Sequence, residues 1–378
     1  MKVTVNNFYH EGPLDFETWL HNELFRAFLD ARDGKRSTMD EFKFEINWEK
    51  NLRQLLYDVM SDRYRPSRGI AFITKRPVPR EIFAAPFRDR IIHHFLYNMS
   101  AEWWDSRLIY DSYSCRKGKG TLFGINRMQH HLRSVSKEYS KEAYVIKMDI
   151  QGYFMSLPRR GLYERVCWGL ERQYKDNKPM YDLLAKLWAR IIFDNPIRDV
   201  KRRGRITDWD LLPSNKSLFN QKPNTGIVIG NLSSQLLSNI YLDMLDRYVT
   251  YELGYKHYGR YVDDFFIVVT PEQYPQAKRD VAKIERFLKD RLELTLHPKK
   301  RHMQEVHKGV EFIGAVLYPG CKVPTKRYKA HFYEAAELVT MGKKDPETIV
   351  SYLGYAKHLN GKKIAAELFD KFGWEYHI

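Results

Sequence analysis

Apolar residues recur at the spacing of an α-helix along much of this chain. Near the N-terminus, this spacing predicts two helices within residues 15–60, with a polar break at residues 33–37 between them. Four prolines exclude helix between residues 66 and 86 and leave extended or loop structure there. The helical periodicity predicts further helices over residues 87–105, 158–193, 233–253 and 272–291.

Shorter apolar runs predict the strands. Residues 144–150 indicate a buried strand that ends in a carboxylate, and residues 294–296 and 310–317 indicate two more short strands. A long polar stretch with prolines, residues 194–226, separates two of the predicted helices. A structureless loop of that length is typical of a functional segment or an insertion.

A β-hairpin is predicted around two adjacent carboxylates. Residues 255–260 are rich in aromatic side chains, with Gly259 as a break, and residues 265–269 are strand formers. Asp263 and Asp264 lie between the two segments. We therefore expect the acidic pair at the turn of the hairpin.

The order of the elements indicates the fold class. The chain runs through helices, a strand, a helix, the hairpin, a helix and a strand pair, and it ends in a basic, mostly helical tail over residues 325–378. A break at Asn360 and Gly361 divides this tail. Helices that alternate with a few non-sequentially paired strands favour an α+β fold, with a split βαβ sheet and helices on one face.

Composition limits the classes of protein. The chain has 378 residues, of which 43% are hydrophobic and 14% aromatic, so a full core is expected and disorder is not. Lysine and arginine number 63 against 47 acidic residues, a net charge of +16. This excess favours a polyanionic partner such as nucleic acid, although a merely solubilising surface would also produce it.

Location is predicted from features that the sequence lacks. The three cysteines have no paired spacing, which favours a reducing compartment over a zinc site or a disulfide framework. The N-terminal residues do not resemble a signal peptide, and no apolar run approaches the roughly 18 residues of a membrane helix. We expect a cytoplasmic protein with no membrane contact.

Three carboxylates suggest a metal site. Neighbouring strand residues point to opposite faces, so only a tight turn brings Asp263 and Asp264 to one place. Asp149 ends the strand predicted at residues 144–150. If that strand pairs with the hairpin, three carboxylates converge and can hold two Mg²⁺ ions about 4 Å apart. Taken singly, each of these residues is equally explained as a solvated turn or a strand end.

An ordered series of motifs resembles the reverse transcriptases over roughly residues 65–320. Each motif is weak alone, but six in order at sensible spacing make a strong signal. The matching segments are Pro79–Ile82 with Phe87–His93, Asp111–Thr121, Lys147–Leu157, Tyr261–Asp264, Leu294–Lys300 and Gly309–Gly314.

The resemblance implies a two-metal polymerase site. Asp149, Asp263 and Asp264 would be the catalytic carboxylates and would bind two Mg²⁺ ions, for which Mn²⁺ is a possible substitute. The backbone carbonyl of Ile150 would assist them. The reaction implied is RNA-directed DNA synthesis from deoxynucleoside triphosphates on a template RNA, through an RNA–cDNA duplex.

The resemblance also implies a nucleotide site. Arg80 would grip the incoming triphosphate, because its guanidinium bonds phosphate oxygens in a bidentate manner. Lys75 would serve the same phosphates. Phe154, preceded by Tyr153, would lie under the sugar, where a bulky ring clashes with a 2′-hydroxyl and so favours deoxynucleotides.

Primer and template contacts are implied further along. Lys300 is expected to contact either the phosphates or the acidic hairpin. Phe312, Ile313 and Gly314 would form the primer grip, where glycine permits close backbone approach, although Phe312 is equally explained as a core residue. Arg116 is included among the predicted primer and template contacts.

One segment, residues 226–235, indicates a subgroup, and the resemblance places its residues Ile229, Gly230 and Gln235 in the nucleotide site. Most reverse transcriptases carry Gln-Gly-x-x-x-Ser-Pro there, whereas this chain has Ile229 before Gly230 and Gln235 in place of proline. That form resembles the enzymes of diversity-generating retroelements, which write mutations opposite template adenines. Ile229 cannot make the hydrogen bond of the usual glutamine, so we predict low fidelity at adenine; simple packing is the alternative role.

The resemblance divides the chain into the parts of a right-hand polymerase. The predicted parts are an N-terminal helical extension (1–65), fingers (66–145), palm (146–157), fingers with an insertion (158–225), palm (226–322) and a helical thumb (323–378). The basic tail and residues 201–205 would hold template RNA through phosphate contacts. A basic oligomeric accessory protein and a bacterial or phage origin are also implied.

Three alternatives stay open at this point. The first is a group II intron-like reverse transcriptase, and the second is a defence-associated polymerase of the retron or abortive-infection type; both would have ordinary fidelity. Ile229 and Gln235 argue against them. The third is an RNA-binding module with an inactive polymerase site, which the presence of all three carboxylates, Arg80 and Phe154 disfavours.

Overall fold

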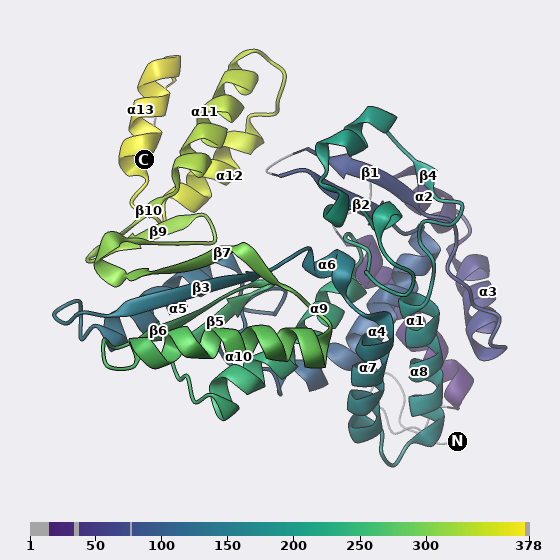
Figure 1. Cartoon of the computed structure of the whole chain (residues 1–378). Helices are drawn as coiled ribbons and strands as arrows, with labels where there is room; N and C mark the ends of the chain where they lie inside the picture. The colour runs from purple at the N-terminus through teal and green to yellow at the C-terminus, as the bar shows by residue number, and fades with distance from the viewer. Residues whose placement is uncertain (1–14, 34–37, 76–77, 375–378) are drawn as a thin grey trace. The chain divides into compact units, whose positions relative to one another are not determined.

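The chain divides into two compact units, each built from two separate stretches of sequence (Figure 1). Unit 1 comprises residues 1–108 and 152–243, and unit 2 comprises residues 109–151 and 244–378. The computed structural model describes residues 15–33, 38–75 and 78–374.

Unit 1 is mainly helical, with one small sheet. The last of its helices, α9, continues into unit 2 from Met244 onward. Its helices and strands are α1 (Phe16–Arg32), α2 (Met39–Glu45), α3 (Trp48–Met60), β1 (Ile70–Thr74), β2 (Arg80–Ala84), α4 (Phe87–Asp105), α6 (Tyr153–Ser156), α7 (Arg159–Gln173), α8 (Lys178–Ile192), β4 (Lys201–Arg202) and α9 (Leu232–Arg247).

Capping and amphipathic spacing explain the first helices. The carboxylate of Asp15 accepts a hydrogen bond from the Thr18 N–H at 2.9 Å and so caps the start of α1. Apolar residues such as Leu20 and Leu24 are fully buried, and α1 packs on α4. The single helix predicted after the polar break is in fact two, α2 and α3, because the chain turns at Ile46 and Asn47.

The small sheet of unit 1 has the order β2-β1-β4. β1 and β2 are antiparallel, whereas β4 joins β1 in parallel. The long polar stretch predicted as structureless therefore contributes a strand, and three short 3₁₀ helices follow it: η1 (Ile206–Leu211), η2 (Ser214–Lys216) and η3 (Leu218–Asn220).

A buried carboxylate holds this insertion to the sheet. Glu81 of β2 is fully buried. It accepts hydrogen bonds from Trp209 Nε1 at 2.7 Å, Ser217 Oγ at 2.8 Å and the Leu218 N–H at 2.6 Å. Three donors from one segment satisfy a charge that would otherwise be costly to bury, so the insertion is ordered by β2 rather than by its own composition.

Unit 2 contains two sheets and most of the C-terminal helices (Figure 1). A π-helical turn, η4 (Tyr248–Glu252), follows α9, and a 3₁₀ turn, η5 (Val306–Lys308), follows β7. The other elements are α5 (Thr121–Val135), β3 (Tyr144–Ile150), β5 (Tyr258–Tyr261), β6 (Asp264–Val269), α10 (Tyr274–Leu292), β7 (Leu296–Glu305), β8 (Val310–Phe312), β9 (Ala315–Tyr318), β10 (Cys321–Pro324), α11 (Lys326–Thr340), α12 (Glu347–Ala356) and α13 (Lys362–Phe372).

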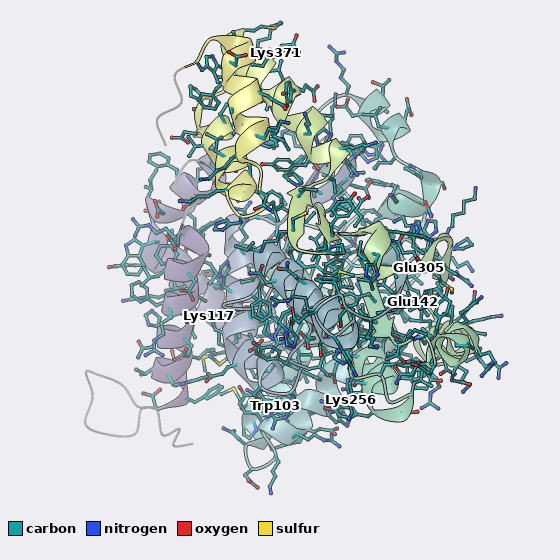
Figure 2. The ribbon with its side chains drawn as sticks, turned by 90° about the vertical axis from the view of Figure 1, so that its left-hand side faces the viewer. Trp103, Lys117, Glu142, Lys256, Glu305 and Lys371 are labelled. Carbon is teal, nitrogen blue, oxygen red and sulfur yellow. The ribbon has the colours of Figure 1, made fainter. Side chains whose placement is uncertain are left out.

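The larger sheet of unit 2 is antiparallel, with the order β5-β6-β3-β7. β3 is central, and its residues Val145, Ile146 and Met148 are buried. Tyr144 pairs with Glu305, so the start of β3 and the end of β7 share one end of the sheet, where Figure 2 labels Glu305. The opposite end of β3 carries Asp149.

A second sheet, β10-β9-β8, and three helices complete unit 2. Phe312 of β8 and Leu317 of β9 join one buried cluster with residues of α5 and of the larger sheet. The helices α11, α12 and α13 contact one another around a smaller cluster that includes Phe332 and Leu368. The predicted helical tail is thereby confirmed, with its break between α12 and α13.

Three sequence predictions need correction in unit 2. No helix was predicted at α5, although Ile125, Met128 and Leu132 follow helical spacing. The strand predicted at residues 294–296 is much longer as β7, and its run of basic residues conceals it in the sequence. The strand predicted at residues 310–317 is two strands joined by a turn. Among the described residues, none of the helices has the length and apolarity that crossing a membrane requires.

Candidate active site

Asp149 and Asp264 stand opposite each other in the antiparallel pair of β3 and β6. Opposed residues of antiparallel strands project from the same face, so both carboxylates lie on one face of the sheet. The Ile150 N–H donates to the Asp263 carbonyl at 3.2 Å and ties the end of β3 to the turn of the hairpin. The pairing predicted between this strand and the hairpin is confirmed.

The hairpin turns through Val262 and Asp263. Val262 has a φ of 57°, in the left-handed region that a β-branched residue rarely enters. Its N–H donates to Ser114 Oγ at 3.1 Å, and its carbonyl accepts from Arg260 Nη1 at 2.9 Å. Such strain persists only where the surroundings hold it, and it is concentrated at functional sites. The two hydrogen bonds hold the turn that carries Asp263.

A buried ion pair supports this turn from below. Arg260 and Asp246 are both 0% exposed. The guanidinium donates from Nε and Nη2 to the two carboxylate oxygens, each at 2.7 Å, and Tyr258 Oη donates to the same carboxylate at 2.6 Å. Sequence reasoning did not assign a role to this pair, because Asp246 lies on a helix whose contact with β5 no local pattern reveals.

The carboxylates of the site destabilise one another. Partial burial raises the pKa of Asp263 to about 7, and the neighbouring negative charge of Asp149 adds to the shift. Burial likewise raises the pKa of Asp264 to about 6, although the Lys147 ammonium opposes the shift. The site therefore disfavours negative charge unless a cation is close.

Two lysines provide such cations. Lys300 Nζ donates to Asp149 Oδ2 at 2.8 Å. Lys147 Nζ lies 3.8 Å from Asp264 Oδ2 and also donates to the Glu311 carbonyl. Lys300 was predicted to contact either the phosphates or the acidic hairpin, and in the structure it contacts Asp149 instead. Lys147 was not among the predicted site residues.

An irregularity in β7 places Lys300. The register of β7 against β3 shifts between Met148 and Ile150, so the pairing is interrupted opposite Asp149. Lys300 lies in the interrupted part of β7. Bulges of this kind redirect side chains next to active sites.

The donor set fits a divalent cation that prefers oxygen ligands. Among the residues that the structure describes, no three His, Cys, Asp or Glu side chains are grouped so as to hold a metal ion. Instead, the ammonium groups of Lys300 and Lys147 partly neutralise the carboxylates of Asp149 and Asp264. Mg²⁺ prefers carboxylate oxygens as ligands, and its positive charge would offset the burial and repulsion that raise the pKa values of Asp263 and Asp264.

The predicted primer grip lies at the junction of β8 and β9. Phe312 is fully buried, so its side chain is a core residue. Ile313 and Gly314 have φ values of 45° and 83°. Tyr355 Oη donates to the Ile313 carbonyl at 2.8 Å, and the Thr325 N–H donates to the Gly314 carbonyl at 3.0 Å. The backbone of this turn is rigidly held, whereas the phenyl ring cannot reach a ligand.

Two predicted cations are engaged within their own units. Arg116 Nη1 in unit 2 donates to the carbonyls of Ile109 at 2.7 Å and Ser112 at 3.1 Å. Lys75 in unit 1 forms an ion pair with Asp208 at 2.7 Å. Each would have to exchange these contacts to bind phosphate.

The predicted nucleotide residues belong to unit 1. Arg80 begins β2 and is exposed. Tyr153 is buried, and its hydroxyl donates to the Ser238 carbonyl at 2.8 Å, so its ring serves the core. Phe154 is half-buried. The structure thus groups the carboxylates in unit 2 and the predicted nucleotide contacts in unit 1.

The subgroup segment packs beside β2. The Phe83 N–H donates to the Ile229 carbonyl at 2.9 Å, and the side chain of Ile229 packs on a cluster that contains Phe83 and Leu218. Gly230 has a φ of 129°, and a Cβ there would lie 2.7 Å from the Phe83 carbonyl oxygen, so only glycine fits. Gln235 is exposed on α9.

Comparison with known proteins identifies the family. The family model described as reverse transcriptase (RNA-dependent DNA polymerase) matches residues 79–317, well over half of the chain. The chain belongs to this reverse transcriptase family. Its fold is accordingly the α+β fold of a right-hand polymerase, as predicted from the sequence. No curated protein matches the sequence.

Two solved telomerase structures are similar at low identity. One is telomerase from Candida albicans in complex with the TWJ fragment of telomeric RNA, with a TM-score of 0.48, 10% identity and coverage of 89% of this chain. The other is apo telomerase from Candida tropicalis, with a TM-score of 0.45, 11% identity and coverage of 86%. The present chain spans 60% and 62% of those two chains.

Proposed function

We propose that this protein is an RNA-directed DNA polymerase that extends a primer with deoxynucleotides on a template RNA. The observation that carries the proposal is the register of β3 and β6, which sets Asp149 opposite Asp264 beside the strained turn of Asp263. Membership of the reverse transcriptase family supports the same activity. We propose that the polymerase has fingers, palm and thumb subdomains with the boundaries predicted from the sequence.

The carboxylates would bind two Mg²⁺ ions, or Mn²⁺ in their place. The bound ions would stabilise the attacking and leaving oxygens of an in-line phosphoryl displacement. Asp149, Asp263 and Asp264 would hold these ions, with the Ile150 carbonyl as a further oxygen ligand. Lys300 would leave Asp149 as the cations bind and would then be available to phosphate oxygens.

Residues of unit 1 would bind the incoming nucleotide. Arg80 is exposed at the start of β2 and would take the triphosphate through its planar guanidinium. The half-buried ring of Phe154 would lie against the sugar and exclude a 2′-hydroxyl. Lys75 would reach the same phosphates by giving up Asp208.

Template RNA would be held largely by charge. The chain has a net charge of +16, and residues 201–205 place exposed cations along β4 and after it. Arg203 lies over the ring of Phe72, with its Cζ 4.8 Å from the ring centroid. An RNA–cDNA duplex would bind the basic helices of the C-terminal tail in the same way.

The finer proposal is a mutagenic enzyme of a diversity-generating retroelement, with errors concentrated at template adenines. The sequence Ile229-Gly230-x-x-x-Ser-Gln235 supports it. Ile229 packs on the cluster that contains Leu218 and places an apolar group where a glutamine would donate a hydrogen bond. A basic oligomeric accessory protein would assist cDNA synthesis, and the protein would act in the cytoplasm of a bacterium, including one infected by a phage.

Primer extension followed by sequencing tests both levels of the proposal. Purified protein, Mg²⁺, a primer and an RNA template are expected to yield cDNA with errors enriched at adenines, and Ile229→Gln is expected to lower those errors. Errors spread evenly over the four bases would favour an intron-like or defence-associated enzyme. RNA binding without any extension, with or without an accessory protein, would instead indicate an inactive binding module.

A further inference from the structure

Unit 1 contains a polar cavity of about 170 Å³ that adjoins the 226–235 segment, but none of the predicted catalytic or nucleotide-binding residues lines it. Its walls come from segments far apart in the sequence. They are residues 66–69 before β1, residues 83–85 at the end of β2, the first turns of α4, residues 191–199 at the end of α8, and residues 226–237 around the start of α9.

The size of the cavity selects a small, flat ligand. A cavity of about 150 Å³ accepts one benzene ring. The present cavity therefore accommodates one ring system but not a whole nucleotide. The exposed side chains of Arg68, Arg198 and Asp199 contribute to its lining, and Asp199 lies 3.9 Å from Arg198, so the rim carries a net positive charge. A sugar and its phosphates would lie at that rim, outside the cavity.

A carboxylate inside the cavity has acceptor capacity to spare. Asp194 is half-buried and takes a hydrogen bond from the Asn195 backbone, with the Arg159 guanidinium nearby. A carboxylate offers about four lone-pair positions. The buried Arg159 is itself committed to the carbonyls of Gly226 at 2.8 Å and Asp194 at 2.5 Å, so it does not neutralise the carboxylate by direct hydrogen bonding.

A second acidic group of the cavity, Asp89, is already satisfied. Asp89 accepts hydrogen bonds from Tyr64 Oη at 3.0 Å and from the Ser67 N–H at 2.7 Å, and it pairs with Arg88 at 3.2 Å. Burial lowers the pKa of His93 to about 3, so its ring is neutral. The third acidic residue, Asp199, is exposed beside Arg198 at the rim, so Asp194 is the charged acceptor that a ligand would meet inside the cavity.

Neutral hydrogen-bonding groups surround this acceptor. The amides of Asn195 and Asn231 and the hydroxyl of Ser234 line the same cavity. An amide offers both donors and an acceptor. This combination of one carboxylate, two amides and a hydroxyl complements the edge of a nucleobase. An apolar side chain from a protein partner would leave the carboxylate uncompensated, which is costly.

We propose that this cavity binds one unpaired nucleobase of the template RNA, preferentially a base with an exocyclic amino group, with the flanking phosphates at Arg68 and Arg198. The inference rests on the proposed function, because it requires the protein to bind template RNA. The exocyclic amino group donates to Asp194. Uracil has only a ring N3–H between two carbonyl groups, whose oxygens the carboxylate repels, so it is expected to bind less tightly. The site thus reads one base outside the primer–template duplex.

An abasic scan of the template tests this inference. The full-length protein is titrated with a primer–template whose single-stranded 5′ template overhang carries one abasic nucleotide, moved position by position, and Kd is measured by fluorescence anisotropy. We expect one position where loss of the base weakens binding about tenfold. At that position, adenine or cytosine is expected to bind more tightly than uracil.

Two variants assign the effect to the cavity. Ala85→Leu fills the cavity. Its Kd for every overhang should equal the Kd of the wild type for the overhang that lacks the critical base. Asp194→Asn keeps the shape and replaces an acceptor with a donor, so it should remove or reverse the preference for amino bases even if Ala85→Leu fails to fold. Glu164→Gln, an exposed change on α7, is the matched control and should leave the scan unchanged.

The outcomes separate the two proposals. A flat abasic scan in a protein that binds and extends the primer overturns the nucleobase site alone. A base preference that persists in both variants also overturns it. A protein that binds no primer–template at all contradicts the proposed function, and the inference fails with it.

Discussion

At the scale of single residues, the site combines strain with like charge. Val262 has a left-handed backbone. Burial raises the pKa values of Asp263 and Asp264, and the nearby charge of Asp149 adds to both shifts. Neither feature stabilises the folded chain. Both are understandable if the arrangement is kept for a ligand that supplies positive charge.

Removing one carboxylate should therefore stabilise the metal-free protein. Burial raises the pKa of Asp263 from 3.8 to about 7. The folded state then holds a proton that the unfolded chain releases, so stability falls as the pH rises from about 4 to about 7. In EDTA, Asp263→Asn should raise the free energy of unfolding by ~1 kcal/mol or more near pH 8 and by less near pH 5, which urea denaturation at the two pH values measures. Equal shifts at both pH values would contradict this account.

The buried pair beneath the turn should have the opposite effect. Arg260→Met leaves Asp246 buried without its partner, which is expected to cost about 3–5 kcal/mol in the free energy of unfolding. Urea denaturation measures this loss. Arg133→Met, which breaks an exposed pair with Glu138, is the control and should cost less than about 1 kcal/mol. Similar losses in the two variants would show that Arg260 does not hold the turn.

At the scale of elements, local sequence patterns predicted the catalytic carboxylates but not the residues that hold them in place. Asp149 ends an apolar run and Asp263 interrupts another, so short windows of sequence predicted both. The contacts of Lys300 and Arg260 depend on strand register and on the packing of α9 against β5, and the local apolar pattern specifies neither. β7 escaped prediction at its full length because basic residues dominate a strand that nevertheless pairs with β3.

The insertion of unit 1 offers a test at the same scale. Glu81→Ala removes the acceptor shared by Trp209, Ser217 and Leu218, and unpaired buried donors cost about 1–3 kcal/mol each. We expect faster hydrogen exchange throughout residues 206–220 and a loss of overall stability of ~2–4 kcal/mol. Exchange rates that match those of the wild type would contradict this anchoring role. Glu164→Ala, a change of an exposed glutamate, should alter neither quantity.

At the scale of the whole molecule, the net charge of +16 predicts salt-sensitive RNA binding. For single strands, the slope of log K against log salt is about −0.7 per phosphate contact. Replacing Lys201, Arg203 and Arg205 with alanine should weaken binding and reduce the magnitude of the slope by about 2. Kd values measured over a salt series provide the slope.

A second triple variant controls for net charge. Lys256, Lys278 and Arg279 are exposed cations of unit 2, and their replacement with alanine removes the same charge. We expect a smaller loss of affinity and little change in slope. Equal effects of the two triple variants would mean that overall charge, and not the β4 segment, holds the RNA.

The two units place the proposed chemistry and the proposed nucleotide contacts on different parts of the chain. The carboxylates belong to the sheet of unit 2, whereas Arg80 and Phe154 belong to unit 1. The proposed reaction therefore requires residues of both units. A substitution in either unit should then abolish extension without unfolding the other.

Single-turnover primer extension by Asp149→Asn tests the central claim most directly. The variant keeps the size of the side chain and removes the charge that Lys300 and the proposed metal ions share. The account predicts that primer–template Kd stays within a few-fold of the wild type, while the extension rate with Mg²⁺ falls by at least about 10³-fold. A variant that binds the primer–template normally and extends it at the rate of the wild type would contradict the assignment of this site.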